Sequence, residues 1–385
     1  MKYLVNRRIF GSKKLVLLAA LTLFAVGSCS PKNAEATNES SMNGFLYRMF
    51  NSFDPTKFLE NMGSNVIPAL FQNVATQAGE LTVAAANLCG STSLAQFQTE
   101  WKENVSALKK VELIQFGPGS ISGYSPLMDF WPLNYETSPP TSADRTALDA
   151  ITGASPNVSG LPAGQRGLPA IEYLIFTAPS PCSSSDRLEL VKSLAADYNS
   201  NSQALFNAWK AGGGNFGGQL ASAGQGSEVF LTKASAFDLI LSNTIDLIHS
   251  MKDAKLEFPS DLMAGGTGLS PDPNKAESRF AGPTQSFQNV KDNVESFKSV
   301  YFGNGGAGLS DYVAFVNPNI DQEVRAELLE LEATLNLLTN FDSGNMTNLK
   351  KAVLELDEIE KLLTTELAAA LGTSPVTGGK GGDGD

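Results

Sequence analysis

Residues 166–176 read Arg-Gly-Leu-Pro-Ala-Ile-Glu-Tyr-Leu-Ile-Phe, so a single carboxylate lies inside an apolar run. Leu168, Ile171 and Leu174 recur at three-residue steps, which predicts a helix whose buried face includes or adjoins Glu172. An unpaired buried charge costs several kcal/mol or more, so this carboxylate needs either a proton or a cation. Arg166, at the start of the run, is the nearest candidate for that cation along the chain.

The other periodic stretches also have the spacing of helices. A glycine-rich part near residues 212–226 divides them into two sets, and no segment alternates long enough to indicate a strand. We therefore predict an all-α fold of two helical bundles, 46–225 and 226–372. An aromatic-glycine pair ends a helix in each half, at Phe116-Gly117 and Phe302-Gly303, which suggests an internal duplication.

Two segments depart from this helical pattern. Residues 116–163 are rich in proline and glycine, which predicts a long irregular excursion within the first bundle; it could serve a function or simply wrap the bundle. Residues 373–385 form a glycine-rich tail. Before the excursion, Ser93 and Gln96 predict a capping box for a helix that runs to about Ile114. The apolar stripe of this helix leads to Glu112, a second inward carboxylate.

The first residues have the pattern of a lipoprotein signal peptide, 1–28. Five basic residues precede an apolar stretch, 15–26, which is too short to span a bilayer. Small residues then precede Cys29, the expected lipid attachment point, and 29–45 would be a flexible tether. We expect a lipid-anchored protein of the bacterial cell envelope, at the outer membrane and facing the periplasm.

Charge and cysteine content restrict the partners and the compartment. The formal net charge is −12, and loss of the basic signal segment would make it more negative, which argues against nucleic acid or anionic membrane surfaces as partners. The lipid alone would contact the membrane. Cys89 and Cys182 remain once Cys29 is lipidated, and in an oxidising compartment they predict a disulfide, with two buried thiols as the alternative.

Histidine content restricts the chemistry. His249 is the only histidine, so a His-Glu-x-x-His zinc site is impossible, and a Ser-His-Asp or Cys-His site would have to use this residue. Carboxylates remain, and hard cations such as calcium or ferric iron accept oxygen ligands, which makes Glu172 and Glu112 the metal candidates. Alternatively each glutamate, including Glu277, pairs with Arg166 or Arg279 or caps a helix.

The 166–176 run resembles the signature segment of the imelysin-like family, Gly-x-His-x-x-Glu, aligned on Gly167, Pro169 and Glu172. Pro169 stands at the histidine position and can neither ligate a metal nor move a proton. Other blocks follow in the family's order. They are Glu112 with Phe116-Gly117-Pro118, Phe130-Trp131-Pro132, Lys255-Leu256, Glu277-Ser278-Arg279-Phe280, Tyr301-Phe302-Gly303 and Asp383-Gly384-Asp385.

The resemblance implies a duplicated helical fold and a functional pocket near the signature, between the two domains. The family includes periplasmic and outer-membrane lipoproteins linked to iron acquisition, and peptidases of the insulin-cleaving type. Two hypotheses follow: a non-catalytic protein that binds a peptide or an iron-related ligand, and a metallopeptidase that uses carboxylates alone. The candidate binding residues are Glu172, Glu112, Arg166, Gly167, Trp131, Glu277 and Arg279.

Overall fold

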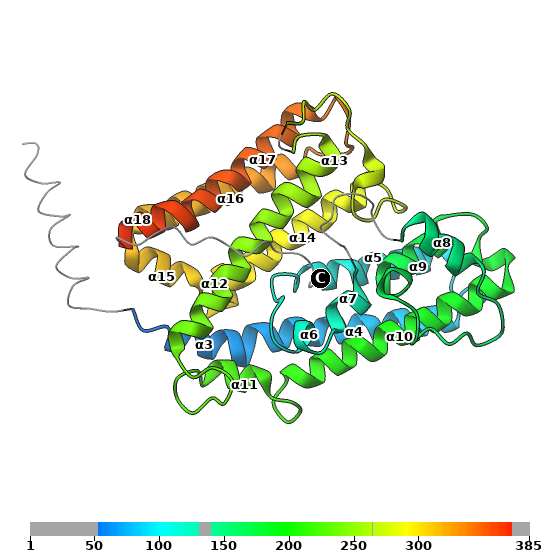
Figure 1. Ribbon diagram of the computed structural model, residues 1–385, viewed down its shortest axis with the longest axis horizontal. Coiled ribbons are helices and arrows are strands. Elements are labelled where there is room, and N and C mark those ends of the chain that lie inside the picture. Colours follow the sequence, from blue (N-terminus) through cyan, green and yellow to red (C-terminus); the bar gives the residue numbers. More distant parts are fainter. Residues whose placement is uncertain (1–52, 131–139, 264, 372–385) are drawn as a thin grey trace, which may run out of the picture. The chain divides into compact units, whose positions relative to one another are not determined.

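Helices form every regular element in the part of the chain that the computed structural model describes, residues 53–130, 140–263 and 265–371 (Figure 1). An isolated bridge between Leu88 and Thr92 is the one β-type pairing in these ranges. The predicted all-α fold is therefore confirmed. The described residues do not include the signal segment 1–28, the tether 29–45, Trp131 or the tail 373–385.

The first part of the chain carries the signature helix. Its elements, in which η marks 3-10 or π-helical segments, are α3 Thr56–Asn61, η1 Met62–Val66, α4 Ile67–Ala86, α5 Leu94–Lys109, α6 Pro118–Ile121, α7 Tyr124–Met128, α8 Ser142–Asp149, η2 Ala163–Gln165, α9 Gly167–Phe176, η3 Pro181–Ser183 and α10 Ser185–Trp209.

The second part begins after the glycine-rich stretch. Its elements are α11 Phe216–Ala221, α12 Lys233–His249, η4 Ser250–Glu257, α13 Phe258–Ser260, η5 Pro273–Lys275, α14 Pro283–Tyr301, η6 Gly303–Gly305, α15 Leu309–Val316, α16 Pro318–Leu335, α17 Met346–Lys361, η7 Leu362–Glu366 and α18 Leu367–Leu371.

Helix α5 begins at the predicted capping box, but it ends earlier than predicted. Ser93 and Gln96 form the capping box, since each side chain accepts a hydrogen bond from the other residue's backbone N–H. The helix ends at Lys109, however, whereas the periodicity predicted a helix to about residue 114. Glu112 therefore lies in the turn after the helix, where its side chain is still buried.

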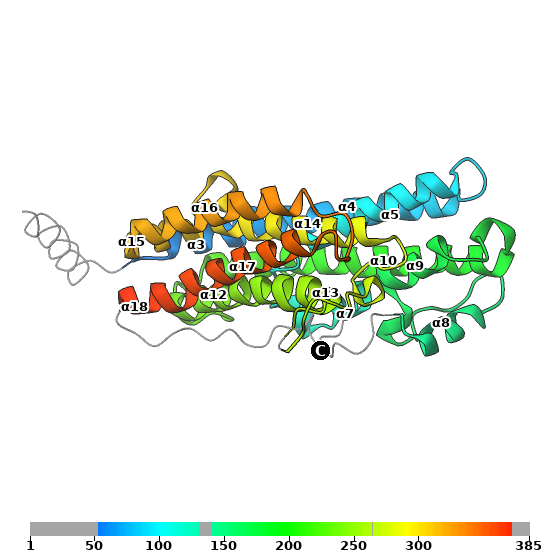
Figure 2. The same cartoon turned by 90° about the horizontal axis from the view of Figure 1, so that it is seen from above.

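The long helices pack in neighbouring pairs. Helix α10 lies along α4, α5 packs on α4, and α17 lies along α16 (Figures 1 and 2). Helix α14 contacts α5 from the first part of the chain as well as α12 and α16 from the second. Asn61 also joins the two parts, because it donates to the carbonyls of Gly303 and Ala307 at 2.8 and 2.9 Å.

These contacts group the described residues between 54 and 371 into one structural unit. The domain boundary near residue 225 and the internal duplication remain predictions. Among the described helices, none has both the length and the apolar character that crossing a bilayer requires.

A disulfide ties the region after α4 to the segment that follows the signature helix. Cys89 and Cys182 are joined, with their Cα atoms 5.3 Å apart and a separation of 93 positions in sequence. Cys89 follows the end of α4, and Cys182 lies in η3, between α9 and α10. The bond thus fixes the chain on the C-terminal side of Glu172.

Candidate functional site

Helix α9 is held by close backbone packing at its first residue. Gly167 has a φ of +66°, and a Cβ atom there would lie 2.1 Å from the carbonyl oxygen of Met128 at the end of α7. Only glycine fits such an approach in this backbone conformation. Trp101 of α5 adds a hydrogen bond, from Nε1 to the Leu168 carbonyl at 2.9 Å. Gly167 is therefore a packing residue that positions the helix carrying Glu172.

Glu172 is buried, with 3% of its surface exposed, and its partners are backbone amides. Oε1 accepts hydrogen bonds from the N–H groups of Phe280 and Ala281, at 2.7 and 2.9 Å. These amides lie in the turn before α14, 108 and 109 residues away in sequence. The carboxyl group therefore ties the signature helix to the second part of the chain.

The prediction that Arg166 neutralises Glu172 was wrong. Arg166 forms a two-point ion pair with Asp197 of α10, at 2.6 and 3.0 Å, and donates to the Ser159 carbonyl at 3.1 Å. It precedes α9 in an extended backbone conformation, with φ −129° and ψ 177°, and its side chain reaches α10. Proximity in sequence therefore did not identify the partner of Glu172.

Burial controls the charge state of Glu172. The pKa of its carboxyl group is raised to about 8, chiefly because burial removes water from the charged form. The hydrogen bonds from the two backbone amides and the charge of Arg279 oppose this rise, and the charge of Glu277 adds to it. The side chain of Arg279 donates hydrogen bonds to the carbonyls of Pro140 and Asn274, at 2.7 and 3.3 Å, and within the described residues it forms no ion pair with Glu172. Glu172 is consequently protonated near neutral pH.

Beside this helix lies a buried group of charged residues, here called the central ion cluster: Lys109, Lys255, Glu112, Glu277 and Asp129. Nζ of Lys255 lies 2.6 and 2.9 Å from the two oxygens of Glu112, and 3.1 Å from Glu277. Nζ of Lys109 lies 3.0 Å from Glu112 and also contacts Asp129 and Glu277. Both lysines are 2% exposed. The cluster joins α5, α7, η4 and the turn before α14.

Two asparagines of α14 complete the hydrogen bonding of the cluster. Asn293 donates to Glu112 at 2.9 Å and to the Lys109 carbonyl at 3.0 Å, while Asn289 donates to Glu277 at 3.0 Å. They are four residues apart, so both amides project from one face of the helix. This face explains why α14 packs against the end of α5.

The environment moves the pKa values of two cluster carboxyl groups in opposite directions. Burial would raise the pKa of Glu112, but the charges of Lys109 and Lys255 and the hydrogen bond from Asn293 lower it to about 2. Burial and the neighbouring glutamates raise the pKa of Asp129, against the lowering effect of Lys109. Glu112 is thus firmly ionised, as an ion-paired carboxylate should be.

Sequence reasoning identified Glu112 as an inward carboxylate and Glu277 as a candidate binding residue, but it missed the lysines that pair with them. The alternative in which Glu277 pairs with an arginine was wrong, because its partners are Lys109 and Lys255. One signal was available in the sequence: Lys109 continues the four-residue steps of Trp101 and Val105. A lysine on an apolar stripe implies a buried anion.

The cluster does not fit a resident metal ion. Carboxylate oxygens of Glu112, Asp129 and Glu277 lie within 4.8 Å of one another, which is a spacing that a hard cation could bridge. The ammonium group of Lys109 already contacts all three, and Lys255 holds two of them. A divalent or trivalent ion would be repelled by both ammonium groups. Each of these three carboxylates is therefore already paired with at least one lysine of the chain.

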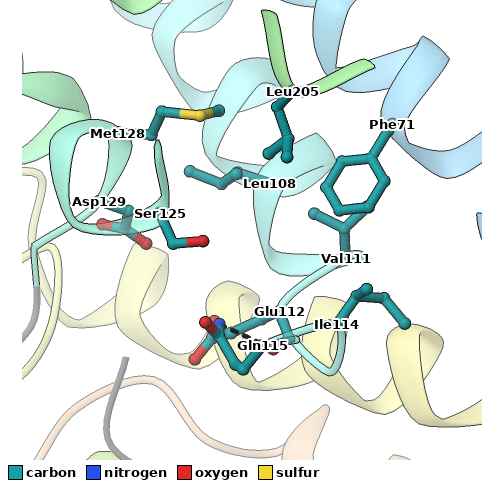
Figure 3. Close-up of a pocket in the computed structure, with 10 residues that line it drawn as sticks. All are labelled: Phe71, Leu108, Val111, Glu112, Ile114, Gln115, Ser125, Met128, Asp129 and Leu205. Carbon is teal, nitrogen blue, oxygen red and sulfur yellow. Dashed lines mark hydrogen bonds between the residues drawn. The ribbon is translucent and has the colours of Figure 1, made fainter. Parts of the chain in front are cut away.

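A small pocket opens next to the cluster (Figure 3). Its volume is about 30 Å³, enough for roughly two water molecules. Its polar lining includes Glu112, Asp129, Gln115 and Ser125, and its apolar lining includes Phe71, Leu108, Val111, Ile114, Met128 and Leu205. The pocket can hydrate the carboxylates but is too small for a peptide.

His249 lies in a separate set of contacts, at the end of α12. Nε2 is 2.9 Å from Asp253 and Nδ1 is 3.5 Å from Glu360. Hydrogen bonds to these carboxylates raise the pKa of the imidazole to about 10, against the effect of partial burial. A histidine that is protonated at neutral pH cannot act as a general base.

Comparisons with known proteins agree with this architecture. The sequence model of the imelysin family matches residues 67–373. Iron-regulated protein A of Synechococcus elongatus is 26% identical over 212 residues, which span 54% of this chain and 53% of that protein, about half its length.

Two solved structures share the fold. One is an iron-regulated protein A precursor from Parabacteroides distasonis, with a TM-score of 0.64 at 17% identity; the match covers 82% of this chain and 94% of that one. The other is an imelysin-like protein from Psychrobacter arcticum, with a TM-score of 0.64 at 14% identity, covering 85% and 99%.

Proposed function

The chain belongs to the imelysin family, and on that premise we propose that it is a non-catalytic binding protein of the bacterial cell envelope with a role linked to iron. Relatives named for regulation by iron support the link to iron. The signal pattern of 1–28 and the position of Cys29 support an exported, lipid-anchored protein at the outer membrane.

The state of the carboxyl groups near the signature is the observation that carries the proposal. Hydrolysis of a peptide bond needs a base or a metal to activate water. Glu172 is protonated near neutral pH, and Glu112 is ion-paired to two lysines. Pro169 stands where the family has histidine, and His249 is engaged elsewhere. None of these groups is prepared to take a proton from water.

Peptide cleavage by the purified full-length protein tests this proposal. We expect no hydrolysis of a mixed peptide panel by the wild type, with or without added divalent metal. Cleavage that disappears in Glu172→Gln would overturn the proposal.

The alternative is a metallopeptidase that uses carboxylates alone; the spacing of Glu112, Asp129 and Glu277 would allow a metal ion only if the ion displaced Lys109 from all three. Elemental analysis of the purified protein, before and after treatment with a chelator, separates the two. We expect less than one equivalent of metal for the binding protein. A stoichiometric metal whose removal abolishes peptide cleavage would favour the peptidase.

A further inference from the structure

We propose that Arg145 and Arg279 together form an oxyanion-binding site, and that the ligand presents a carboxylate group to them. This inference rests on the proposed function and adds the chemical class of the ligand. Arg145 lies in α8, and Arg279 lies in the turn that carries the backbone amides bound by Glu172. The site therefore adjoins the signature helix.

The two guanidinium groups are neighbours because they share one acceptor. Nη1 of Arg145 and Nη2 of Arg279 both donate to the carbonyl oxygen of Pro140, at 3.1 and 2.7 Å. Nε of Arg279 is buried without a hydrogen-bond partner in the described part of the chain. Both side chains are half-buried. Hydrogen-bonding capacity on Arg279 is thus left unused beside a second cation.

An aromatic pair supports both arginines. The rings of Tyr173 and Phe280 lie 5.4 Å apart. The Arg279 guanidinium lies 4.7 Å from the centre of the Phe280 ring. The Arg145 guanidinium lies 6.0 Å from the centre of the Tyr173 ring and 5.9 Å from that of Phe280. Stacking on aromatic rings restricts the guanidinium groups, which reduces the entropy lost when they bind a planar anion.

Charge distinguishes these two arginines from the other arginines in the described ranges. Arg166, Arg187 and Arg325 each form an ion pair with an aspartate. Within residues 53–130, 140–263 and 265–371, neither Arg145 nor Arg279 has an ion-pair partner. Like charges repel, so Arg145 disfavours the charged form of Arg279: burial and the charge of Arg145 lower the pKa of Arg279, whereas Glu172 and Asp272 raise it. A bound anion would relieve this repulsion.

The net charge of the chain favours a small carboxylate over a polyanion. Guanidinium groups bind carboxylate and phosphate oxygens through paired N–H donors. The net charge of −12 repels extended polyanions such as nucleic acid, so a compact ligand with charge at one end is the better match. A polycarboxylate could engage both arginines at once and could also carry ferric iron through its remaining oxygens.

Calorimetric titration of the full-length protein with citrate, ferric citrate and inorganic phosphate tests the proposal. We expect citrate, free or iron-loaded, to bind more tightly than phosphate. Arg145→Gln and Arg279→Gln should each raise the dissociation constant for citrate by about tenfold or more, because each removes a charged hydrogen-bond donor. Arg279→Lys keeps the positive charge but loses the planar, paired N–H donors of the guanidinium group, so this variant should also bind citrate more weakly.

Arg325→Gln is the matched control. Arg325 stacks on Phe302 at 4.6 Å, but Asp321 already neutralises it at 2.8 Å, so this change should leave citrate binding unaltered. Thermal unfolding of each variant confirms that it is folded.

Citrate binding that is absent, or that survives Arg145→Gln and Arg279→Gln, would overturn the proposal. Phosphate binding at least as tight as citrate would overturn the carboxylate assignment. Neither result bears on peptide cleavage, which tests the proposed function separately.

Discussion

Nζ of Lys255 lies 2.6 Å from Oε1 of Glu112, although 143 residues separate the two in sequence. The pair joins the turn after α5 to the π-helical segment η4, and Lys109 contacts the same carboxylate from the end of α5. Both parts of the chain therefore contribute to one buried charge network. A network of this kind tolerates loss of a member poorly, since a remaining charge is left in a medium of low polarity.

Glu112→Gln should lower the free energy of unfolding by about 3–5 kcal/mol, because it leaves two buried ammonium groups with one carboxylate fewer. Urea unfolding of the two proteins at neutral pH measures the difference. Glu295→Gln is the control: it breaks the half-exposed pair with Lys298 and should change stability by less than about 1 kcal/mol. Equal effects of the two substitutions would contradict the importance of the buried cluster.

Loss of the disulfide should also destabilise the protein. The double variant Cys89→Ser, Cys182→Ser should lose about 2–5 kcal/mol of stability, because the bond closes a loop of 93 residues and restricts the unfolded chain. Chemical unfolding with and without reductant gives the measurement. Reductant should reproduce the loss in the wild type and leave the double variant unchanged. If reductant lowered the stability of both proteins equally, the effect would not come from this bond.

Anchoring through Cys29 is testable by cell fractionation. If Cys29 carries the lipid, Cys29→Ser should move the protein from the membrane fraction to the soluble periplasm, because no described helix of the mature chain is long and apolar enough to cross a bilayer. Ser30→Ala, in the next position, is a control that should keep the protein in the membrane fraction. Retention of Cys29→Ser in the membrane would mean that another segment anchors the protein.

The sequence predicted the helices well because their signals are local. Apolar periodicity and the Ser93–Gln96 capping box depend on residues within a turn or two, and the structure contains both. The end of α5 was predicted too late, because the periodic stripe continues in the turn that carries Glu112. Periodicity records which side chains are buried and does not distinguish a helix from a turn that buries the same residue.

The partners of the buried charges were less predictable, because they come from distant parts of the chain. Glu172 is bonded to the amides of Phe280 and Ala281, and backbone donors leave no mark in a sequence. Arg145 lies in the proline-rich excursion, where no periodic pattern indicated a role. Arg279 was a candidate through its place in a family block, whereas its neighbour was found only in the folded chain.

Glu172 gives a stability prediction that depends on pH. The pKa of its carboxyl group rises from a usual value of 4.5 to about 8 in the folded state. Between these values the folded protein holds a proton that the unfolded chain has released, so stability falls as pH rises from about 5 to 8. Glu172→Gln removes this titration, and its amide oxygen can still accept the two backbone hydrogen bonds.

The variant should therefore gain stability relative to the wild type as pH rises, by several kcal/mol at most. Unfolding free energies of both proteins at pH 5 and pH 8 measure the gain, with Glu295→Gln as an exposed control whose difference from the wild type should stay constant. An ion-paired glutamate would behave differently: it is already ionised at pH 5, so its neutral substitute would be less stable than the wild type by an amount that hardly changes between pH 5 and pH 8. A large loss for Glu172→Gln at pH 8 would therefore show that the folded protein holds Glu172 as a charged, structural group. A gain would instead show that the fold holds this carboxyl group in an environment unfavourable to its charge, as expected of a residue kept for binding.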